Sequence, residues 1–315
     1  MKYCPITYEA IAEDQQYSVK GLKLLAPNLK CLNILEFDQK MLRAEAVARA
    51  GKMSIQGVQT KLSAQLKIKE GRFELVSEHG HYILKPQSEY YPDLPENESI
   101  TMFLARLIGL EVPVHGLIYA RDNSLVYFVK RFDRIGKNKK LAQEDFAQLS
   151  LQSRYTKYDG SMEKVADIVQ KYCSFPKIEL IKLAKYTLFN FLIGNEDMHL
   201  KNFSLITRDR VITLSPVYDL LNTTIVTPST KEEMALPIRG RKNNLTRKDL
   251  LEYYCQEKLG VSKNILNKIL TEFSEVIPNW KIYIMRSYLP NKMKQAYLDL
   301  IEERSERVEL GTFFP

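Results

Sequence analysis

The sequence lacks the features that mark several common kinds of protein. It has four cysteines, Cys4, Cys31, Cys173 and Cys255, and no C-x-x-C pair among them. Because no histidine stands at ligand spacing beside any of these cysteines, we expect no zinc site. The opening MKYCPITYEA has no apolar core like that of a signal peptide, and no run of about 18 uncharged apolar residues occurs. These absences predict a protein of the reducing cytoplasm that has no contact with a membrane.

Two common nucleotide-binding motifs are also missing. The chain contains no G-x-x-x-x-G-K-S/T, so a P-loop NTPase has no support, and no G-x-G-x-x-G, so a dinucleotide-binding fold has none either. Neither an internal repeat nor a low-complexity tract is present. A nucleotide, if one is bound, must be held by a different arrangement of residues.

The chain does carry an excess of positive charge. Its 315 residues have a formal net charge of +8, with 45% hydrophobic and 27% charged residues. This composition is that of a folded globular chain, and the charge favours a polyanionic partner such as ATP, nucleic acid or an acidic protein surface. Basic residues gather in two loop-like clusters, Arg134, Lys137, Lys139 and Lys140, and Arg239, Arg241, Lys242, Arg247 and Lys248. Both clusters could equally be ordinary solvated loops.

The hydrophobic pattern changes along the chain from a period of two to helical spacing. Asn97 is a plausible cap for a helix over 97–108, and Gly109 stands at its exit. The pattern predicts strands at 62–68, 72–76, 81–84, 114–120 and 125–132, and helices at 39–50, 97–108, 162–172, 178–193, 263–276 and 280–302. We therefore expect an α+β fold of two lobes, a β-rich lobe over 1–134 and a mainly helical lobe over 135–315, with a cleft between them.

The strongest local signal is the polar octet NEDMHLKN at 195–202, which directly follows an apolar helix. Asp197 and Asn202 have the D-x-x-x-x-N spacing of kinase catalytic loops, in which the Asp accepts the substrate hydroxyl proton and the Asn holds a metal ion. Asp219 lies in LSPVYDL, an apolar run that we expect to be strand-like up to this carboxylate, where a second magnesium ligand is required. Taken alone, the first pair could be a helix cap and a turn Asn, and Asp219 could cap the next turn.

Lys85 ends the strand-like segment HYILKP, from which its ammonium group can reach the phosphates of a nucleotide. Glu98, near the start of the following helix, could pair with Lys85 and hold it extended. The alternatives are an edge lysine whose ammonium reaches solvent and a first-turn Glu favoured by the helix dipole.

A cover for the phosphates could come from the segment SIQGVQTK near 54–61, just ahead of the first strand. Ser54 and Gly57 are among the small and polar residues there, whose backbone N–H groups could face phosphate. An ordinary loop is the alternative.

The ordered set SIQGVQTKLS, ILKP, NESITMFLARLIGLEVP, VKRFDR, LAQEDFAQ, IGNEDMHLKNFSL and PVYDLL resembles the HipA family of bacterial serine/threonine kinase toxins. The resemblance covers about residues 50–225. The opening CPITYE resembles the short HipT-type members, which lack the N-terminal subdomain of full-length HipA. Gln56 stands where some short members have a second serine.

This resemblance implies a role for each of the residues named above. Asp197 would be the catalytic base, Asn202 and Asp219 would hold Mg²⁺, and Lys85 would contact the phosphates of ATP. His199 would belong to the catalytic loop, the backbone around Lys130 and Phe132 would be the hinge that meets adenine, and Ser54 would be the autophosphorylated, inactivating serine.

The family also implies partners. The expected phosphate acceptor is an aminoacyl-tRNA synthetase, and the expected partners are a helix-turn-helix antitoxin that binds operator DNA and a small separate protein corresponding to the missing subdomain. DNA would be contacted only through the antitoxin. Two other hypotheses remain open, a small-molecule or lipid kinase on the same scaffold and a pseudokinase-like, DNA-bound corepressor.

Overall fold

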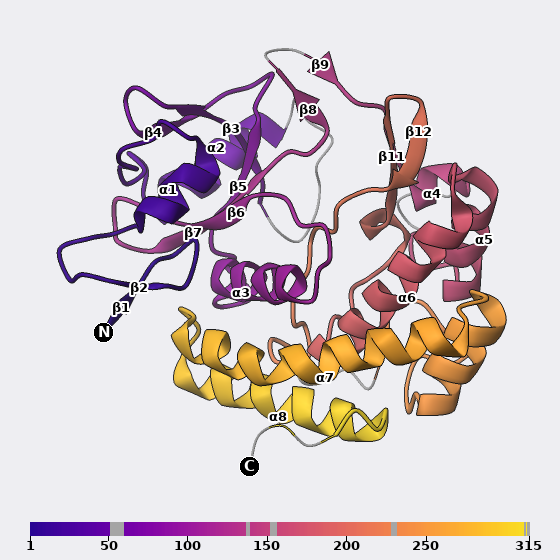
Figure 1. Ribbon diagram of the computed structural model, residues 1–315. Coiled ribbons are helices and arrows are strands. Elements are labelled where there is room, and N and C mark those ends of the chain that lie inside the picture. The colour runs from indigo at the N-terminus through magenta and orange to yellow at the C-terminus, as the bar shows by residue number, and fades with distance from the viewer. Residues whose placement is uncertain (51–59, 137–138, 152–155, 228–231, 312, 314–315) are drawn as a thin grey trace. The chain divides into compact units, whose positions relative to one another are not determined.

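The computed structural model describes residues 1–50, 60–136, 139–151, 156–227, 232–311 and 313 (Figure 1). The chain divides into two compact units, each assembled from separate stretches of sequence. The first unit comprises Met1–Ile100, Pro113–Lys139 and Met285–Pro290, and the second comprises Thr101–Val112, Lys140–Ile284 and Asn291–Pro315.

The first part of the chain is rich in β-structure. Its elements are β1 (Lys2–Tyr3), β2 (Ala10–Ile11), α1 (Val19–Leu25), α2 (Gln39–Ala50), β3 (Leu62–Lys67), β4 (Arg72–Leu75), β5 (Tyr82–Lys85), α3 (Leu94–Leu107), β6 (His115–Tyr119), β7 (Leu125–Lys130), β8 (Arg134–Ile135) and β9 (Lys139–Lys140). The strands predicted from period-two alternation are therefore present.

The core of the first unit lies on a five-stranded antiparallel sheet with the order β4-β3-β5-β7-β6. Figure 1 shows α1 and α2, in indigo, beside this sheet. Leu62 on β3 stands opposite Leu84 on β5, which in turn stands opposite Phe128 on β7, and all three side chains are buried. Burial of this apolar row fixes the register, because a slip of one residue would turn the row to the other face. The register also places Lys85 opposite Tyr127.

Helix α3 begins earlier than the sequence predicted. It starts at Leu94, so the expectation that Asn97 caps it is wrong, and the N–H of Asn97 already donates to the carbonyl of Asp93 at 2.9 Å. Pro95 lies in the first turn, where its missing N–H costs no hydrogen bond. Gly109 follows the helix with a φ of +79°, as expected for a glycine at a helix exit.

The second part of the chain is mainly helical. Its elements are β10 (Gln143–Asp145), α4 (Phe146–Leu149), α5 (Met162–Tyr172), α6 (Pro176–Ile193), the 3₁₀ turn η1 (Leu200–Asn202), β11 (Ser204–Arg208), β12 (Val211–Leu214), the π-type helix η2 (Lys248–Lys258), α7 (Lys263–Arg286) and α8 (Asn291–Arg307). Strands β10, β11 and β12 form a small antiparallel sheet.

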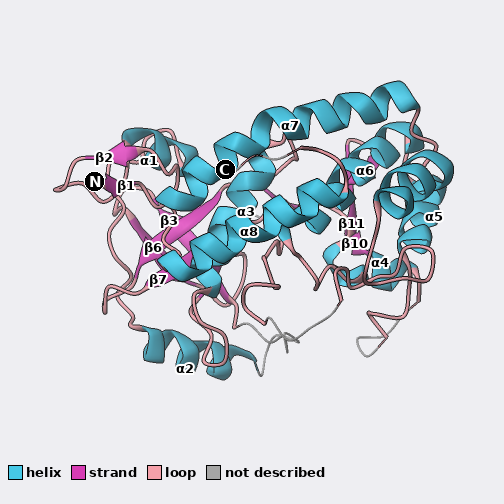
Figure 2. Cartoon of the chain, turned by 90° about the horizontal axis from the view of Figure 1, so that it is seen from below, coloured by secondary structure: helices cyan, strands magenta, loops and turns pink. Residues whose placement is uncertain are grey.

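Two further predictions need correction in this part. The helices expected at 263–276 and 280–302 are not separated at Pro278, which lies inside the continuous helix α7, and the chain breaks instead between Arg286 and Asn291. The run before Asp219 is not a strand, since β12 ends at Leu214. Figures 1 and 2 both show α7 and α8 side by side. None of the helices in the described ranges is long and apolar enough to span a membrane.

Candidate active site

Helix α6 ends where the polar octet begins. Gly194 takes the left-handed conformation with a φ of 73°, which lets the chain turn sharply out of the helix. The buried Asn195 side chain then donates to Oδ1 of Asn190 at 2.8 Å, inside the helix. The loop that follows is therefore fixed at its first residue.

The same loop brings Asp197 and Asn202 together. The Asn202 side-chain amide donates to the carbonyl oxygen of Asp197 at 3.0 Å, and the Asn202 backbone N–H donates to the carbonyl of His199 at 2.9 Å. Asn202 is buried, whereas the Asp197 side chain remains 53% exposed. The amide nitrogen of Asn202 is therefore used inside the loop.

Asp219 is held against this loop by contacts on both sides of it. The hydroxyl of Tyr218, the residue before, donates to the carbonyl of Lys201 at 2.9 Å. The hydroxyl of Thr223 accepts from the backbone N–H of Glu196 at 2.7 Å and donates to the carbonyl of Gly194 at 3.1 Å. The segment around Asp219 is thus tied to both ends of the octet.

The backbone of Asp219 is itself unusual. Its φ is 55°, in the left-handed region that only a few per cent of non-glycine residues adopt. Burial lowers the pKa of His199 in the 195–202 loop, and the negative charge of Asp219 is one of the influences that oppose this lowering. Backbone strain of this kind is concentrated at functional sites.

A buried ion pair supports the loop from helix α8. Glu196 and Arg304 are 7% and 3% exposed, with Arg304 Nη2 at 3.7 Å from Glu196 Oε1. Arg304 also donates to the carbonyl of Phe191, and the Thr224 hydroxyl donates to Glu196 at 2.7 Å. Sequence patterns did not predict this support, because its partners are about a hundred residues apart in the chain.

His199 lies beside Asp197 but forms its hydrogen bond with Lys157. Its Nε2 is 4.0 Å from Asp197 Oδ1 and only 2.7 Å from the ammonium nitrogen of Lys157. Burial, and then the charge of Lys157, lower the pKa of His199, while Asp197 raises it. The ring is therefore favoured in its neutral form, with Nε2 accepting from Lys157. Lys157 is another neighbour that the sequence patterns did not single out.

The predicted contact between Lys85 and Glu98 is present in the first unit. The two side chains form an ion pair and are 2% and 1% exposed. The ammonium of Lys85 also lies 5.5 Å from the centre of the Tyr127 ring, which favours a cation. The arrangement holds a lysine at the end of a central strand, as expected from its position in HYILKP.

The remaining predicted site residues are those of the hinge and of the phosphate-covering loop. Lys130 ends β7 and Phe132 follows it, both half-buried. The backbone N–H of Lys130 already donates to Val114 at 2.7 Å and that of Arg131 to His81 at 2.8 Å. Ser54 and Gly57 lie outside the described residues, so the predicted phosphate-covering loop does too.

The donor set fits magnesium better than a transition metal. Among the residues that the structure describes, no three His, Cys, Asp or Glu side chains gather in a way that could hold a metal ion. A zinc site would need such a cluster of side chains. Mg²⁺ commonly takes only one or two protein oxygens and completes its shell with water and substrate phosphates. The amide oxygen of Asn202 and the carboxylate of Asp219 are ligands of that kind.

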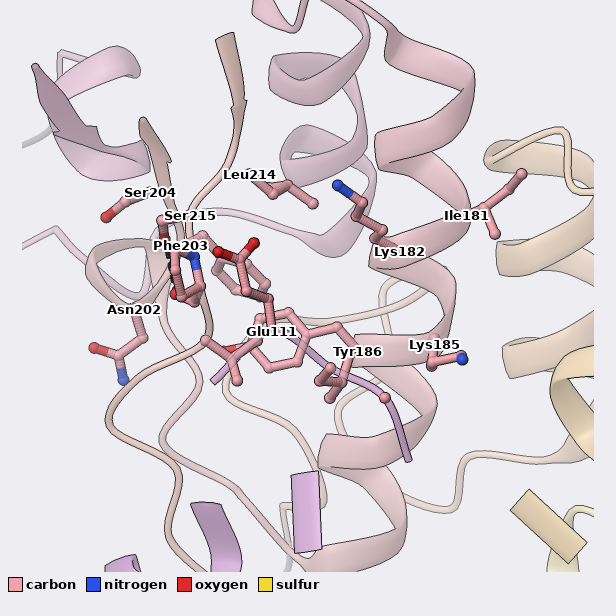
Figure 3. Close-up of a pocket in the computed structure, with 14 residues that line it drawn as sticks. Glu111, Ile181, Lys182, Lys185, Tyr186, Asn202, Phe203, Ser204, Leu214 and Ser215 are labelled. Carbon is pink, nitrogen blue, oxygen red and sulfur yellow. Dashed lines mark hydrogen bonds between the residues drawn. The ribbon is translucent and has the colours of Figure 1, made fainter. Parts of the chain in front are cut away.

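A pocket of about 210 Å³ opens beside the end of the 195–202 loop, within the second unit (Figure 3). It is lined by Gly109–Glu111, Ile181, Lys182, Lys185, Tyr186, Asn202–Ser204 and Leu214–Val217. Figure 3 shows the Glu111 carboxylate turned into the pocket, while Lys185 is turned away from it. The Val217 N–H donates to the Glu111 carbonyl at 2.9 Å and links the wall of the pocket to the segment leading to Asp219.

The chain is similar to several known proteins. The model of the HipA-like C-terminal domain matches residues 53–280. A Haemophilus influenzae protein provisionally named a kinase is 28% identical, with 96% of this chain and 94% of that protein covered. The serine/threonine-protein kinase toxin HipA of Shewanella oneidensis is also 28% identical, but the match covers 72% of this chain and only 56% of the toxin.

Several solved structures share the fold. The Shewanella oneidensis HipA, in a complex with HipB and operator DNA, matches 94% of this chain and 79% of that chain with a TM-score of 0.68 at 21% identity. The Helicobacter pylori proinflammatory kinase CtkA matches 73% of this chain and 88% of that chain with a TM-score of 0.53 at 14% identity.

The fold is therefore α+β and protein-kinase-like, with a β-rich lobe and a mainly helical lobe, which confirms the predicted fold class. The chain belongs to the family of the HipA-like C-terminal domain, whose model covers well over half of it. This confirms the resemblance to HipA that the ordered motifs indicated.

Proposed function

We propose that this protein is a Mg-ATP-dependent serine/threonine protein kinase that acts as the toxin of a toxin–antitoxin system. One observation carries the proposal. Asp197 and Asn202 share one hydrogen-bonded loop, and the segment carrying Asp219 is tied to both ends of that loop through Tyr218 and Thr223. A base and two oxygen ligands in one small region are what phosphoryl transfer requires of a protein.

Each residue has a defined task in this proposal. The half-exposed carboxylate of Asp197 accepts the proton of the acceptor hydroxyl. His199, neutral and bonded to Lys157, shapes the loop at 4.0 Å from Asp197 rather than taking that proton itself. The oxygens of Asn202 and Asp219 would hold Mg²⁺, which when bound would neutralise charge on the phosphates.

The first unit supplies the nucleotide contacts in this proposal. The ammonium of Lys85, held by its ion pair with Glu98, would contact the phosphates. The backbone around Lys130 and Phe132 would contact adenine. Because the N–H groups of Lys130 and Arg131 are already bonded, adenine would have to use other backbone groups of this segment. Gly57 would belong to the phosphate cover and Ser54 would be the site of autophosphorylation.

The proposed acceptor is an aminoacyl-tRNA synthetase, and the proposed site of action is the cytoplasm. The proposed partners are a helix-turn-helix antitoxin, through which the protein would reach DNA, and a small separate protein. Support for the antitoxin comes from the complex of the Shewanella HipA with HipB and operator DNA. The assignment to the short HipT type is proposed from the resemblance of the opening CPITYE to those members. The chain spans 94% of its Haemophilus relative and 56% of the Shewanella HipA toxin.

A phosphate-transfer assay tests the proposal. The protein is incubated with γ-labelled ATP, Mg²⁺ and a bacterial lysate, and the labelled species are separated and identified. We expect a labelled protein, and we expect Asp197→Asn to slow labelling by about 10²–10⁴-fold, the usual share of a general base. Asp209→Asn is the matched control, because Asp209 is an exposed aspartate in a turn of the same unit.

Two outcomes would contradict the proposal. Undiminished labelling by the Asp197→Asn protein would show that Asp197 is not the base. Label found only in small metabolites or lipids would replace a protein kinase with a small-molecule kinase. Peptide mapping of the labelled enzyme tests Ser54 separately, because phosphate found elsewhere with Ser54 bare would refute that assignment.

A further inference from the structure

The short segment from Thr156 to Gly160 lies directly on the catalytic loop. The Leu200 backbone N–H donates to the carbonyl of Lys157 at 3.2 Å. A Cβ added to Gly160 would come within 3.1 Å of a Leu200 methyl carbon, so the Gly160 backbone packs closely against the Leu200 side chain. This segment has no kinase motif, and no role for it followed from the sequence.

Two side chains of this segment lie against the catalytic residues. The Tyr158 ring meets the His199 ring edge to face, with centres 5.1 Å apart. The ammonium of Lys157 lies 4.7 Å from the centre of the Tyr158 ring and bonds to His199 at 2.7 Å. Tyr158 is thus held between a cation and an imidazole ring.

The Tyr158 hydroxyl donates a hydrogen bond of 2.6 Å to Oδ1 of Asp197. In the proposed reaction an acceptor hydroxyl must make this same contact, because Asp197 takes its proton as the oxygen receives the phosphoryl group. The lone pair of Oδ1 that accepts from Tyr158 cannot accept from a second hydroxyl at the same time. An acceptor therefore has to compete with a group that the protein already carries.

We propose that Tyr158 is a built-in competitor that occupies the acceptor position on Asp197, so that an acceptor hydroxyl reaches the base only after displacing the phenol. The proposal rests on the proposed kinase function and adds a specificity-determining residue to it. An acceptor protein would be selected partly by its ability to move Tyr158 aside. Small hydroxyl compounds, which offer few contacts to replace those of Tyr158, would be disfavoured.

The properties of Tyr158 suit a competitor better than a second base. Burial and then the hydrogen bond to Asp197 raise the pKa of its phenol, so it stays protonated and remains a donor at neutral pH. The side chain is nevertheless 42% exposed. A group so exposed can be displaced without opening the hydrophobic core.

Kinetics with Tyr158→Phe test this proposal. The substitution removes only the hydroxyl and keeps the ring against His199. We expect the KM for the protein acceptor to fall by about threefold to tenfold, where tenfold corresponds to about 1.4 kcal/mol, while the KM for ATP stays unchanged. Tyr90→Phe is the matched control, because Tyr90 is 80% exposed in the first unit.

The outcomes separate this proposal from the kinase function. An unchanged acceptor KM with normal phosphate transfer would overturn the competitor and leave the kinase intact. Phosphotyrosine at position 158 would also overturn it, because Tyr158 would then be a substrate. The absence of phosphate transfer in wild type and variants alike would refute the kinase function, and this proposal with it.

Nitration by tetranitromethane gives a readout that does not depend on activity. The reagent attacks phenolates, so its rate at Tyr158 should rise by about tenfold for each pKa unit that the phenol recovers. We expect faster nitration of Tyr158 in Asp197→Ala, measured by peptide mass spectrometry, with Tyr90 as the internal control. Equal rates in the wild type and Asp197→Ala would show that the contact is absent in solution and would overturn the proposal.

Discussion

The ion pair between Lys85 and Glu98 makes a prediction about stability that is independent of catalysis. Both side chains are almost completely buried, at 2% and 1% exposed. Lys85→Met removes the charge but keeps most of the side-chain volume, and it leaves the Glu98 carboxylate in an apolar place without its ammonium. Removing one partner of a buried pair costs about 3–5 kcal/mol. We expect a loss of that size in the free energy of unfolding.

Urea unfolding followed by far-UV circular dichroism measures this loss. With a slope of about 2 kcal/mol per molar urea, the midpoint should fall by about 1.5–2.5 M. Lys67→Met is the matched control, since the pair of Lys67 with Glu74 spans the same sheet but is 38% and 39% exposed. It should cost no more than about 1 kcal/mol. Equal midpoints for Lys85→Met and Lys67→Met would refute the reasoning.

Three further predictions concern stability and pH. Gly194→Ala should destabilise the second unit by about 1–3 kcal/mol, because φ is +73° and the new Cβ would lie 2.5 Å from a Leu300 methyl carbon. Unfolding followed by the fluorescence of Trp280, the one tryptophan in the sequence, measures this loss of stability. Thr223→Val should cost about 1–2 kcal/mol in the same assay, because it removes the acceptor of the Glu196 N–H. Burial raises the pKa of Glu96 from 4.5 to about 7, so its protonated form stabilises the fold below pH 4.5 and this stability is lost as the pH rises through 7. Glu96→Gln should therefore narrow the difference between urea midpoints at pH 5 and pH 8, and an unchanged difference would contradict the raised pKa.

Local patterns in the sequence were sufficient for much of the fold. Helix α5 begins and ends where its apolar spacing predicts, at Met162 and Tyr172, because a serine cap and strong amphipathicity act within the helix itself. Strands β3 and β5 were also predicted, because the alternation of apolar residues that marks a strand is a local pattern. The predicted break near Pro278 was wrong because packing of the buried Ile277 and Trp280 holds α7 together through the proline.

Only part of the candidate site could be predicted from local patterns in the sequence. The spacing of Asp197 and Asn202 is local, and so it could be read directly from the sequence. The contact of Tyr158 with Asp197 joins residues 39 positions apart, and Glu196 meets Arg304 over a still longer separation. Such pairs depend on how the helices pack, and no periodicity or motif in a single sequence encodes them.

Calorimetric titration with ATP in the presence and absence of Mg²⁺ tests the central claim most directly. We expect Mg-dependent binding by the wild type and a much weaker affinity in both Lys85→Met and Asp219→Ala. Asp197→Asn should bind about as tightly as the wild type, because the proposed role of Asp197 is in proton transfer. Wild-type affinity in both Lys85→Met and Asp219→Ala would contradict the account.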